Sequence, residues 1–423
     1  MATLDITIDD LGAQGDGIAH VHNRTVFVAG ALPDEKVRVE IKETEPGKKS
    51  VVQRATLLEI LIPSSQRSQP LCPHFPQCGG CRFQHMTDSA YSAFKVEQLH
   101  TLLTQAAVPF PSMMPSVVTA NLTRRRIRVA CMHTNKGVIV GFNAWRSRTI
   151  IDVKSCEVIT PPLLELIDRL RRHLALWLPT GESCDVQLTS LPEGVDVVLI
   201  GGPKLDMESR EKLGMLAQSL NIARLSWRKW DRSPIEPIAH RTPLFVQFGE
   251  TRVPFPAGSF LQATVAGEEA LTRFADSAVQ PGQKVLDLFC GLGTFGLSLE
   301  NPKSVHFCDL DGPATQSLQS AIKANPTWEV SLRNLNTDPF LAQECNDFDF
   351  VIFDPPRGGA KAQAHQLAQS NVPTIVAISC DPTSFARDAK ILIEGGYNFE
   401  KLLPVDQFLW SPHLEVAGLF VRR

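Results

Sequence analysis

The chain lacks any apolar segment long enough to cross a membrane. No run in its 423 residues approaches the about 18 consecutive apolar residues that a spanning helix needs. The N-terminus, MATLDITIDD, is acidic and lacks the basic start and apolar core of a secretory signal peptide. Internal repeats and low-complexity tracts are missing too. These absences predict an ordered cytoplasmic protein, not bound to membranes, whose length suits about two to four domains.

The chain also lacks an overall excess of positive charge, with a formal net charge of −3 and an isoelectric point near 6.4. Global charge therefore gives no argument for nucleic-acid binding, although a local basic face is enough for it. The segment LTRRRIRVACM supplies such a face, because Arg124, Arg125, Arg126 and Arg128 alternate there with apolar residues on an expected strand. Guanidinium groups suit bidentate phosphate contacts, so we expect this row to contact RNA; the alternative is a solvated edge.

Ten cysteines in a chain without a secretion signal indicate metal binding or catalysis rather than disulfides. Three of them, Cys72, Cys78 and Cys81, are spaced C-x5-C-x2-C. Gly79 and Gly80 let the backbone fold tightly around a bound centre. Three clustered thiolates predict a metal ion or a metal cluster in a reducing compartment.

The identity of that centre depends on its fourth ligand. Zinc prefers a second C-x2-C or a histidine pair, and the chain has neither, which leaves His74 or His85 as alternative zinc ligands. One distant fourth cysteine is typical of iron–sulfur ligation, and Cys156 is the natural candidate, with Cys131 as its rival. We therefore expect a structural [4Fe-4S] cluster held by Cys72, Cys78, Cys81 and Cys156.

The pattern along the chain predicts a multi-domain α/β protein with three domains. Residues 1–61 alternate apolar and polar positions between glycine turns, as in an OB-like β-barrel. Residues 62–255 are expected to form a central, RNA-facing α/β domain that includes the cysteine segment. Residues 256–423 repeat strand, loop and helix, which predicts a doubly wound, Rossmann-like sheet with a late antiparallel hairpin.

The C-terminal domain begins with KVLDLFCGLGTFG, an apolar strand that ends in a glycine-rich turn. The glycines Gly291, Gly293 and Gly296 let the backbone approach a nucleotide cofactor closely. The next strand ends in Asp309, where an acid can accept bonds from ribose hydroxyls, and Asp311 competes for this role. A dehydrogenase would share these features, so the motif alone does not decide the chemistry.

The stretch TIVAISCDPTSFARD places Cys380 at the end of another buried strand, before a turn that caps a new helix. Open α/β sheets bind ligands at such strand ends, and the dipole of the following helix favours a thiolate. Cys380 is therefore a candidate nucleophile, the alternative being a small buried thiol. Cys290, on the glycine turn, is a rival thiol that we interpret as packing.

Taken together, the motifs LDLFCGLGTFG, DPPR, SCDPTSFARD and PHLEVAGLF resemble those of the RNA 5-methyluridine methyltransferases that carry an iron–sulfur centre. The N-terminal segment resembles a TRAM module, with Gly15, Gly17 and Gly30-Ala31-Leu32-Pro33 as landmarks. The resemblance implies S-adenosylmethionine as cofactor, RNA as partner and Cys380 and Glu415 as nucleophile and base. It implies that the cofactor-binding residues are Gln262, Phe289, Thr294, Asp309, Asn334 and Asp354.

Three positions depart from the family pattern. The second strand reads CDLDG where relatives usually place Glu, Asn336 competes with Asn334, and SCDP stands where most members read SCNP. The implied reaction adds Cys380 to carbon 6 of uracil, which makes carbon 5 nucleophilic towards the methyl group; Glu415 then removes the carbon 5 proton. Asp354 is expected to bind the uracil or position the cofactor, and Arg357 to touch the RNA.

The expected substrate is a uridine of 23S ribosomal RNA, with a transfer RNA T-loop uridine as the alternative. Two other classes compete with this reading. Methylation of an exocyclic amine normally uses N/D-P-P-Y/F without a partner cysteine, which DPPR and Cys380 do not match. A non-catalytic iron–sulfur RNA-binding protein is disfavoured by the presence of both Cys380 and Glu415. A monomer is the default expectation.

Overall fold

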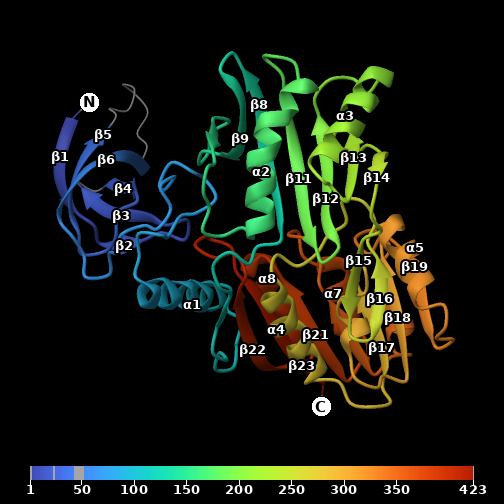
Figure 1. Ribbon diagram of the computed structural model, residues 1–423. Helices are drawn as coiled ribbons and strands as arrows, with labels where there is room; N and C mark the ends of the chain where they lie inside the picture. Colours follow the sequence, from blue (N-terminus) through green and yellow to red (C-terminus); the bar gives the residue numbers. More distant parts are fainter. Residues whose placement is uncertain (1, 22–23, 42–51, 423) are drawn as a thin grey trace. The chain divides into compact units, whose positions relative to one another are not determined.

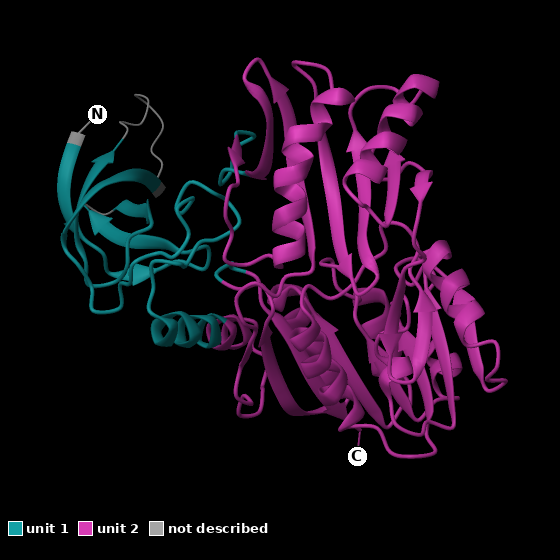
Figure 2. Cartoon of the chain, viewed as in Figure 1, with its two compact units in different colours: residues 1–98, 143–149, 410–412 teal, residues 99–142, 150–409, 413–423 magenta. Residues whose placement is uncertain are grey.

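The computed structural model describes residues 2–21, 24–41 and 52–422 (Figure 1), and the chain divides into two compact units. Figure 2 colours the units separately: unit 1 comprises Met1–Gln98, Asn143–Thr149 and Trp410–Pro412, and unit 2 comprises Leu99–Phe142, Ile150–Leu409 and His413–Arg423. The helix α1 (Asp88–Gln105) runs from the first unit into the second. The motifs expected to carry catalysis lie in unit 2.

Unit 1 is built on a six-stranded sheet whose strands pair in the order β1-β5-β6-β4-β3-β2. The strands are β1 (Ala2–Thr7), β2 (Asp10–Leu11), β3 (Asp16–Val21), β4 (Arg24–Ala29), β5 (Lys36–Ile41) and β6 (Val52–Ile62). Apolar side chains alternate along them, so that Val37 and Val39 of β5 share a core with Val26 and Val28 of β4. The expected strands are confirmed. In the described part of the chain β1 and β2 stand at the two ends of the order, and closure into an OB-like barrel stays a prediction.

Unit 2 contains a seven-stranded central sheet of order β10-β9-β8-β11-β12-β13-β14. Its strands are β8 (Arg126–Thr134), β9 (Gly137–Asn143), β10 (Ile150–Asp152), β11 (Ser183–Leu191), β12 (Gly194–Gly201), β13 (Arg224–Arg228) and β14 (Glu236–His240). Two helices, α2 (Pro161–His173) and α3 (Met207–Ser219), pack their leucines on one face of this sheet, and the short helix η1 (Leu174–Leu176) follows α2. Strand alternation turns the polar residues of β8, β11 and β13 to the opposite face.

The C-terminal part of unit 2 is an eight-stranded sheet of order β19-β18-β17-β20-β21-β23-β22-β7. Its strands are β7 (Val117–Val118), β17 (Lys284–Leu288), β18 (Ser304–Asp309), β19 (Trp328–Leu332), β20 (Phe350–Phe353), β21 (Thr374–Ser379), β22 (Asn398–Asp406) and β23 (Glu415–Val421). The pairs from β19 to β21 are parallel, and β23 is antiparallel to both β21 and β22. The expected doubly wound sheet with a late antiparallel hairpin is confirmed. The edge strand β7 comes from outside the expected 256–423 segment.

Helices cover both faces of this sheet, because alternate residues of its strands enter two separate cores. One core joins Val285 and Phe307 to α4 (Val265–Asp276) and α5 (Gly312–Ala321). The other joins Leu286 and Phe353 to α7 (Lys361–Gln369) and α8 (Pro382–Glu394). The remaining elements are a hairpin and two short helices: β15 (Phe245–Phe248), β16 (Thr251–Pro254), η2 (Gly296–Ser298) and α6 (Ala342–Cys345).

A search of the described helices finds none that is both long and apolar enough to cross a membrane.

Candidate active site

The residues expected to carry the chemistry gather at one edge of the eight-stranded sheet. Phe289, Asp354 and Cys380 each follow directly on the last residue of a parallel strand, and Asp309 ends β18. The antiparallel strand β23 begins at this same edge, where its first residue, Glu415, pairs with Val405 near the end of β22. A doubly wound sheet thus brings together groups that lie far apart in the sequence.

Cys380 lies in the turn between β21 and α8 and is half-buried. Burial first, and then the nearby carboxylates of Glu415 and Asp354, raise the pKa of its thiol to about 12 against the opposing effect of Arg357. The expectation that the helix dipole lowers this pKa is therefore wrong. The physical reason is that burial and the carboxylates of Glu415 and Asp354 outweigh any favourable effect of the helix N-terminus. Asp381 caps α8 by accepting from the backbone N–H groups of Thr383 (2.8 Å) and Ser384 (3.2 Å).

Glu415 is almost completely buried, with 2% of its surface exposed. Burial and the charge of Asp354 raise its pKa to about 8, although a hydrogen bond from Gln407 and the charge of Arg357 act in the opposite direction. Its Oε1 accepts from Gln407 Nε2 at 3.0 Å, whereas Oε2 has no hydrogen-bond partner among the residues that the structure describes. Such a carboxyl is suited to exchange a proton near neutral pH.

Gln262 and Asp354 are joined directly, since Gln262 Nε2 donates to Asp354 Oδ2 at 2.9 Å. Burial raises the pKa of Asp354 to about 7 despite this bond, and the charge of Asp309 adds to the increase. The resemblance implied that Gln262 binds the cofactor, which stays a prediction. In the structure it is buried and belongs to the same polar cluster as the DPPR carboxylate.

Gln407, which the sequence did not single out, connects the two halves of this cluster. It follows β22 and is 1% exposed. Its Nε2 lies 2.6 Å from Gln262 Oε1 and 3.0 Å from Glu415 Oε1. A continuous chain of side-chain hydrogen bonds therefore runs from Asp354 through Gln262 and Gln407 to Glu415.

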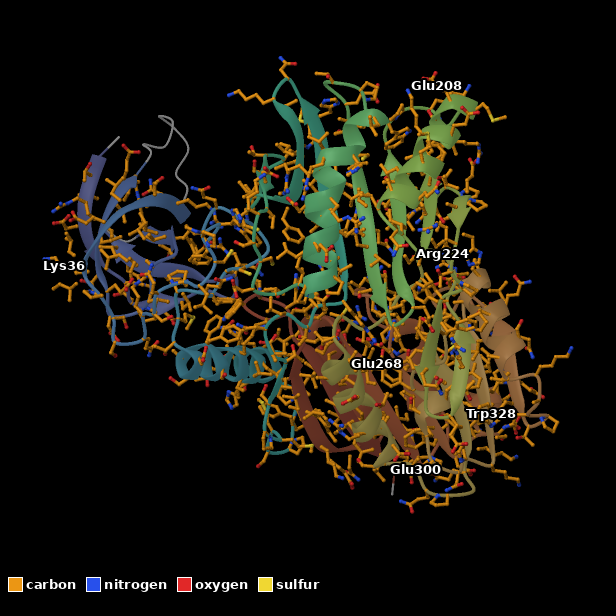
Figure 3. The ribbon with its side chains drawn as sticks, in the orientation of Figure 1. Lys36, Glu208, Arg224, Glu268, Glu300 and Trp328 are labelled. Atoms are coloured by element: carbon orange, nitrogen blue, oxygen red, sulfur yellow. The ribbon has the colours of Figure 1, made fainter. Side chains whose placement is uncertain are left out.

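The segment that carries Gln262 is fastened to the polar face of the central sheet. Arg125 Nε donates to the carbonyl of Gln262 at 3.1 Å, and its guanidinium forms an ion pair with Glu268 of α4, labelled in Figure 3. Four residues before Gln262, Gly258 accepts from the side chain of Gln187 (2.9 Å) and donates its N–H to Asp196 (2.9 Å). The central sheet thus positions a residue of the active-site edge.

The arginine row has a mixed role in the structure. Arg125 faces inward, as described, and Arg126 lies 5.0 Å from the centroid of the Phe260 ring, where burial lowers its pKa to about 10. Arg128 is the exposed member and pairs with Asp185 and Asp231. β8 begins only at Arg126, so the row is not one continuous strand face. Arg146 and Arg148 follow β9 outside any strand.

The glycine-rich turn is held against the acidic end of β18. The N–H of Gly291 donates to Asp309 Oδ2 at 2.8 Å, and a Cβ added at Gly291 would meet nothing within 4 Å, so the space beside the turn is open. Asp311 instead caps α5 by accepting from the N–H of Ala314 at 3.2 Å. Asp309 Oδ1 also accepts from the N–H of Asp311 at 2.8 Å, and the choice of Asp309 over Asp311 as the ribose acceptor stays a prediction.

The other expected cofactor residues flank this turn. Phe289 follows β17 with a left-handed φ of 57°, and Thr294 is half-buried within the turn. Asn334 follows β19 and is half-buried, whereas its rival Asn336 is exposed and donates its N–H to Asn334 Oδ1 at 3.2 Å. Burial raises the pKa of Cys290 well above the ordinary thiol value, in line with its expected packing role.

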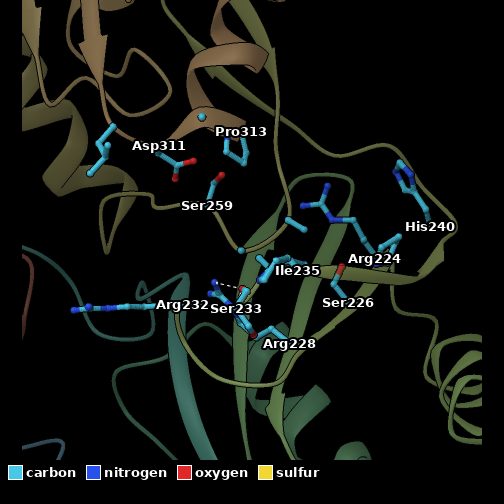
Figure 4. A pocket seen from close by; sticks show the side chains of 16 residues that line it. Arg224, Ser226, Arg228, Arg232, Ser233, Ile235, His240, Ser259, Asp311 and Pro313 are labelled. Atoms are coloured by element: carbon cyan, nitrogen blue, oxygen red, sulfur yellow. Dashed lines mark hydrogen bonds between the residues drawn. The ribbon is translucent and has the colours of Figure 1, made fainter. Parts of the chain in front are cut away.

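A separate hollow lies between the central sheet and the start of α5 (Figure 4), with a volume of about 760 Å³. The side chain of Asp311 lines it from the α5 side. The basic residues that line it are Arg224, Arg228, Arg232 and His240. Ser226 also lines it, and its Oγ is buried without a partner in the described ranges. The sequence contains no motif for this hollow, because its residues come from separate segments: β13, β14 and the loop between them, residues 257–259 and residues 310–313.

Three of the expected cluster cysteines, Cys72, Cys78 and Cys81, lie half-buried in unit 1, and Cys156 lies half-buried in unit 2. Within residues 2–21, 24–41 and 52–422 no group of three or more His, Cys, Asp or Glu side chains is arranged to hold a metal ion. The tight backbone is confirmed, since a Cβ at Gly79 would come within 2.6 Å of the carbonyl of Asn143.

Two of the rival ligands, Cys131 and His85, are buried, and both ring nitrogens of His85 lack a hydrogen-bond partner among the described residues. Cys131 is fully buried on β8, opposite Cys184 of β11, and a hydrogen bond with Cys184 together with burial raises its pKa. His85 is 1% exposed and stacks on Phe75, with ring centroids 5.4 Å apart. Both are core side chains.

The sheet order, the glycine turn beside an acid and the polar cluster around a cysteine define a methyltransferase fold with a nucleotide-cofactor site. The solved structure of the Pyrococcus abyssi tRNA (uracil-54, C5)-methyltransferase in complex with S-adenosyl-L-homocysteine has the same fold, with a TM-score of 0.73. It is 21% identical in sequence, and the match covers 99% of this chain and 100% of that one.

Sequence comparisons identify the family. Residues 187–423 match the model of the tRNA (Uracil-5-)-methyltransferase family, and residues 2–48 match the TRAM domain. An uncharacterized RNA methyltransferase of Brucella suis is 36% identical over 99% of this chain and 98% of its own length. The 23S rRNA (uracil(1939)-C(5))-methyltransferase RlmD of Shewanella piezotolerans is 30% identical over 99% of this chain and 95% of its own.

The chain belongs to the tRNA (uracil-5-)-methyltransferase family. It is an RNA uracil-5 methyltransferase that depends on S-adenosylmethionine, with an N-terminal TRAM domain.

Proposed function

We propose that the enzyme methylates a uridine of 23S ribosomal RNA through a covalent adduct between Cys380 and carbon 6 of the uracil. The observation that carries the proposal is the meeting of Cys380 and Glu415 at one sheet edge. Ser379, directly before the cysteine, pairs with Val416, directly after the glutamate, and the charge of Glu415 acts on the Cys380 thiol. A nucleophile and a buried acid–base group in such proximity suit addition followed by elimination.

In the first step, the thiolate form of Cys380 adds through Sγ to carbon 6 and leaves an enolate, which makes carbon 5 nucleophilic. S-adenosylmethionine supplies the methyl group, whose bond to sulfur breaks as its bond to carbon 5 forms. Glu415 then takes the proton from carbon 5, the 5,6 double bond re-forms and the bond between carbon 6 and sulfur breaks. Cys380 leaves as a thiolate. The target base must be unstacked from the RNA to reach this edge.

Because the pKa of Cys380 is raised, the site must favour the thiolate form before the addition to carbon 6. Burial contributes most to it, and the carboxylates of Glu415 and Asp354 contribute next, so protonation of either carboxyl favours the thiolate. Arg357 is the cation that opposes them, and its guanidinium lies 3.2 Å from His413 Nε2. A bound uracil that displaces water and accepts hydrogen bonds from this cluster completes the site.

The donor S-adenosylmethionine is proposed to lie along the glycine turn. The open space beside Gly291 and the carboxylate of Asp309 fit a ribose and its substituents. The residues proposed to bind it are Gln262, Phe289, Thr294, Asp309, Asn334 and Asp354.

The preference for 23S rRNA is supported by the RlmD relative, which is named for that RNA and whose match extends over 99% of the chain. The basic hollow beside α5 supports an RNA partner as well, because its arginines are suited to phosphate. A transfer RNA uridine is the second candidate, favoured by the name of the structural neighbour.

We also propose that Cys72, Cys78, Cys81 and Cys156 ligate a [4Fe-4S] cluster. The support is their spacing, the closeness of the backbone at Gly79 and the burial of the rival Cys131 in the sheet core. Such a ligand set needs a reducing compartment, and we therefore propose that the protein is cytoplasmic. We also propose that it is a monomer.

Replacement of the nucleophile tests the covalent reaction. We expect Cys380→Ala to abolish methyl transfer and to leave no protein–RNA adduct on a denaturing gel. Cys345→Ala is the matched control, because Cys345 is a buried thiol of α6 that packs in the core beneath this sheet. A Cys380→Ala protein that still produces 5-methyluridine would refute the covalent route.

A further inference from the structure

We infer that Gln407 is a positioning residue for proton removal from carbon 5, because its amide fixes which oxygen of Glu415 faces the substrate. The inference rests on the proposed function. Gln407 is 1% exposed, and its amide touches two residues that the mechanism uses, Gln262 and Glu415. No motif marks it in the sequence.

The hydrogen-bond partners determine the orientation of the amide. The backbone N–H of Thr264 donates to Gln407 Oε1 at 3.4 Å, which places the NH₂ group towards two acceptors. These are Gln262 Oε1 at 2.6 Å and Glu415 Oε1 at 3.0 Å. An amide NH₂ group has two protons, and both are used here.

The same bonds orient Gln262. Because the carbonyl oxygen of Gln262 accepts from Gln407, its NH₂ group faces Asp354 and donates to Oδ2 at 2.9 Å. Removal of the Gln407 amide therefore removes one constraint on the base and one on the Gln262–Asp354 pair.

The consequence for Glu415 is that one oxygen is occupied and the other remains available. Oε1 is held by Gln407, whereas Oε2 is buried and makes no hydrogen bond to any described residue. Rotation of the carboxyl group is opposed by the bond to Oε1. Oε2 is accordingly the atom that takes the proton from carbon 5.

The fold holds Gln407 rigidly. Thr264 caps α4 by accepting from the N–H of Gly267 at 3.0 Å, and the same Gly267 lies against the Gln407 side chain. A Cβ at Gly267 would come within 2.9 Å of both Gln407 Cβ and Oε1. The start of α4 thus packs closely against the side-chain amide of Gln407.

The test separates proton removal from the earlier steps by single-turnover kinetics with labelled S-adenosylmethionine and substrate RNA. We expect Gln407→Met, which keeps the side-chain length and loses the amide, to form methylated adduct and to release it about tenfold or more slowly than the unmodified enzyme. The adduct should then accumulate on a denaturing gel, as we also expect for Glu415→Gln. Gln407→Glu should move the midpoint of the pH profile of release to higher pH, because a second carboxylate raises the pKa of Glu415.

Gln363→Met is the matched control. Gln363 is also fully buried, and among the described residues its amide bonds the backbone of Phe340 and the thiol of Cys345. We expect it to lower stability without trapping adduct. If Gln407→Met releases product at the control rate while Glu415→Gln traps adduct, the role of Gln407 is refuted and the mechanism stands. If Glu415→Gln and the unmodified enzyme form no adduct at all, the proposed function itself fails.

Discussion

The side chain of Gln262 donates a hydrogen bond of 2.9 Å to the carboxyl of Asp354. Gln262 belongs to a segment that is anchored on the central sheet, and Asp354 follows β20 of the catalytic sheet. This bond joins the two sheets of unit 2 at the catalytic edge. A change in the anchor should therefore reach the chemistry without touching a catalytic group.

The first prediction concerns that anchor. Arg125→Met removes the bond to the Gln262 carbonyl and leaves Glu268 buried without its partner, since the two side chains are 14% and 12% exposed. We expect the free energy of unfolding to fall by about 3 kcal/mol, the usual cost of breaking a buried ion pair, and kcat to fall at least tenfold. Denaturant unfolding and methyl-transfer kinetics measure the two effects.

The double variant Arg125→Met with Glu268→Gln is the control for this prediction. It removes the unpaired charge, so most of the stability should return while the Gln262 segment stays unanchored. Recovery of full activity in the double variant would show that the anchor does not matter for catalysis.

The second prediction concerns pH. The pKa of Glu415 is raised to about 8, chiefly by burial, so below that pH the carboxyl is mostly protonated and cannot accept the carbon 5 proton. Release of methylated RNA should accelerate about tenfold per pH unit as the pH rises towards 8 and then level off. Rapid-quench measurement of adduct decay from pH 6 to 9 gives the profile, and a flat profile would exclude Glu415 as the base.

The third prediction concerns the basic hollow. Arg228→Ala combined with Arg232→Ala should raise KM for RNA several-fold and reduce the salt dependence of RNA binding, with KM for S-adenosylmethionine unchanged. Arg172→Ala is the matched control, because this exposed arginine lies on α2, on the other face of the central sheet. An equal effect of the control, or a change in cofactor KM alone, would contradict an RNA-binding role.

The fourth prediction concerns the cluster. Anaerobically prepared protein should contain about four iron and four sulfide per chain and show the broad visible absorbance of thiolate-ligated iron. Cys156→Ala should lose most of the iron. Cys131→Ala should keep it, since Cys131 packs beside Cys184 in the central sheet. Zinc in place of iron would refute the assignment.

The sequence predicted the positions of those functional residues that directly follow or end parallel strands. A repeated strand, loop and helix predicts that the carboxyl ends of parallel strands converge, and this placed Asp309, Asp354 and Cys380 at one edge before any coordinates. The sequence could not show which residues form hydrogen bonds or ion pairs with buried polar side chains. Arg125 appeared to be an RNA contact because its partner, Glu268, lies 143 positions later in the chain.

Gln407 was missed for the same reason. Its partner Gln262 lies 145 positions earlier, and VDQFLWSP contains no spacing that marks a functional amide. The pKa of Cys380 was misjudged because the helix dipole was considered alone. The burial of Cys380 and its closeness to the carboxylates of Glu415 and Asp354 appear only in three dimensions.

The central claim is methylation of carbon 5 of a uridine in 23S rRNA. The most direct measurement uses two parallel incubations of the enzyme with labelled S-adenosylmethionine, one with unmodified 23S rRNA and one with unmodified tRNA. Each RNA is then digested, and the labelled nucleoside is identified by mass. The account predicts 5-methyluridine from 23S rRNA and none from tRNA. Label confined to tRNA would contradict the substrate, and a labelled nucleoside other than 5-methyluridine would contradict the chemistry.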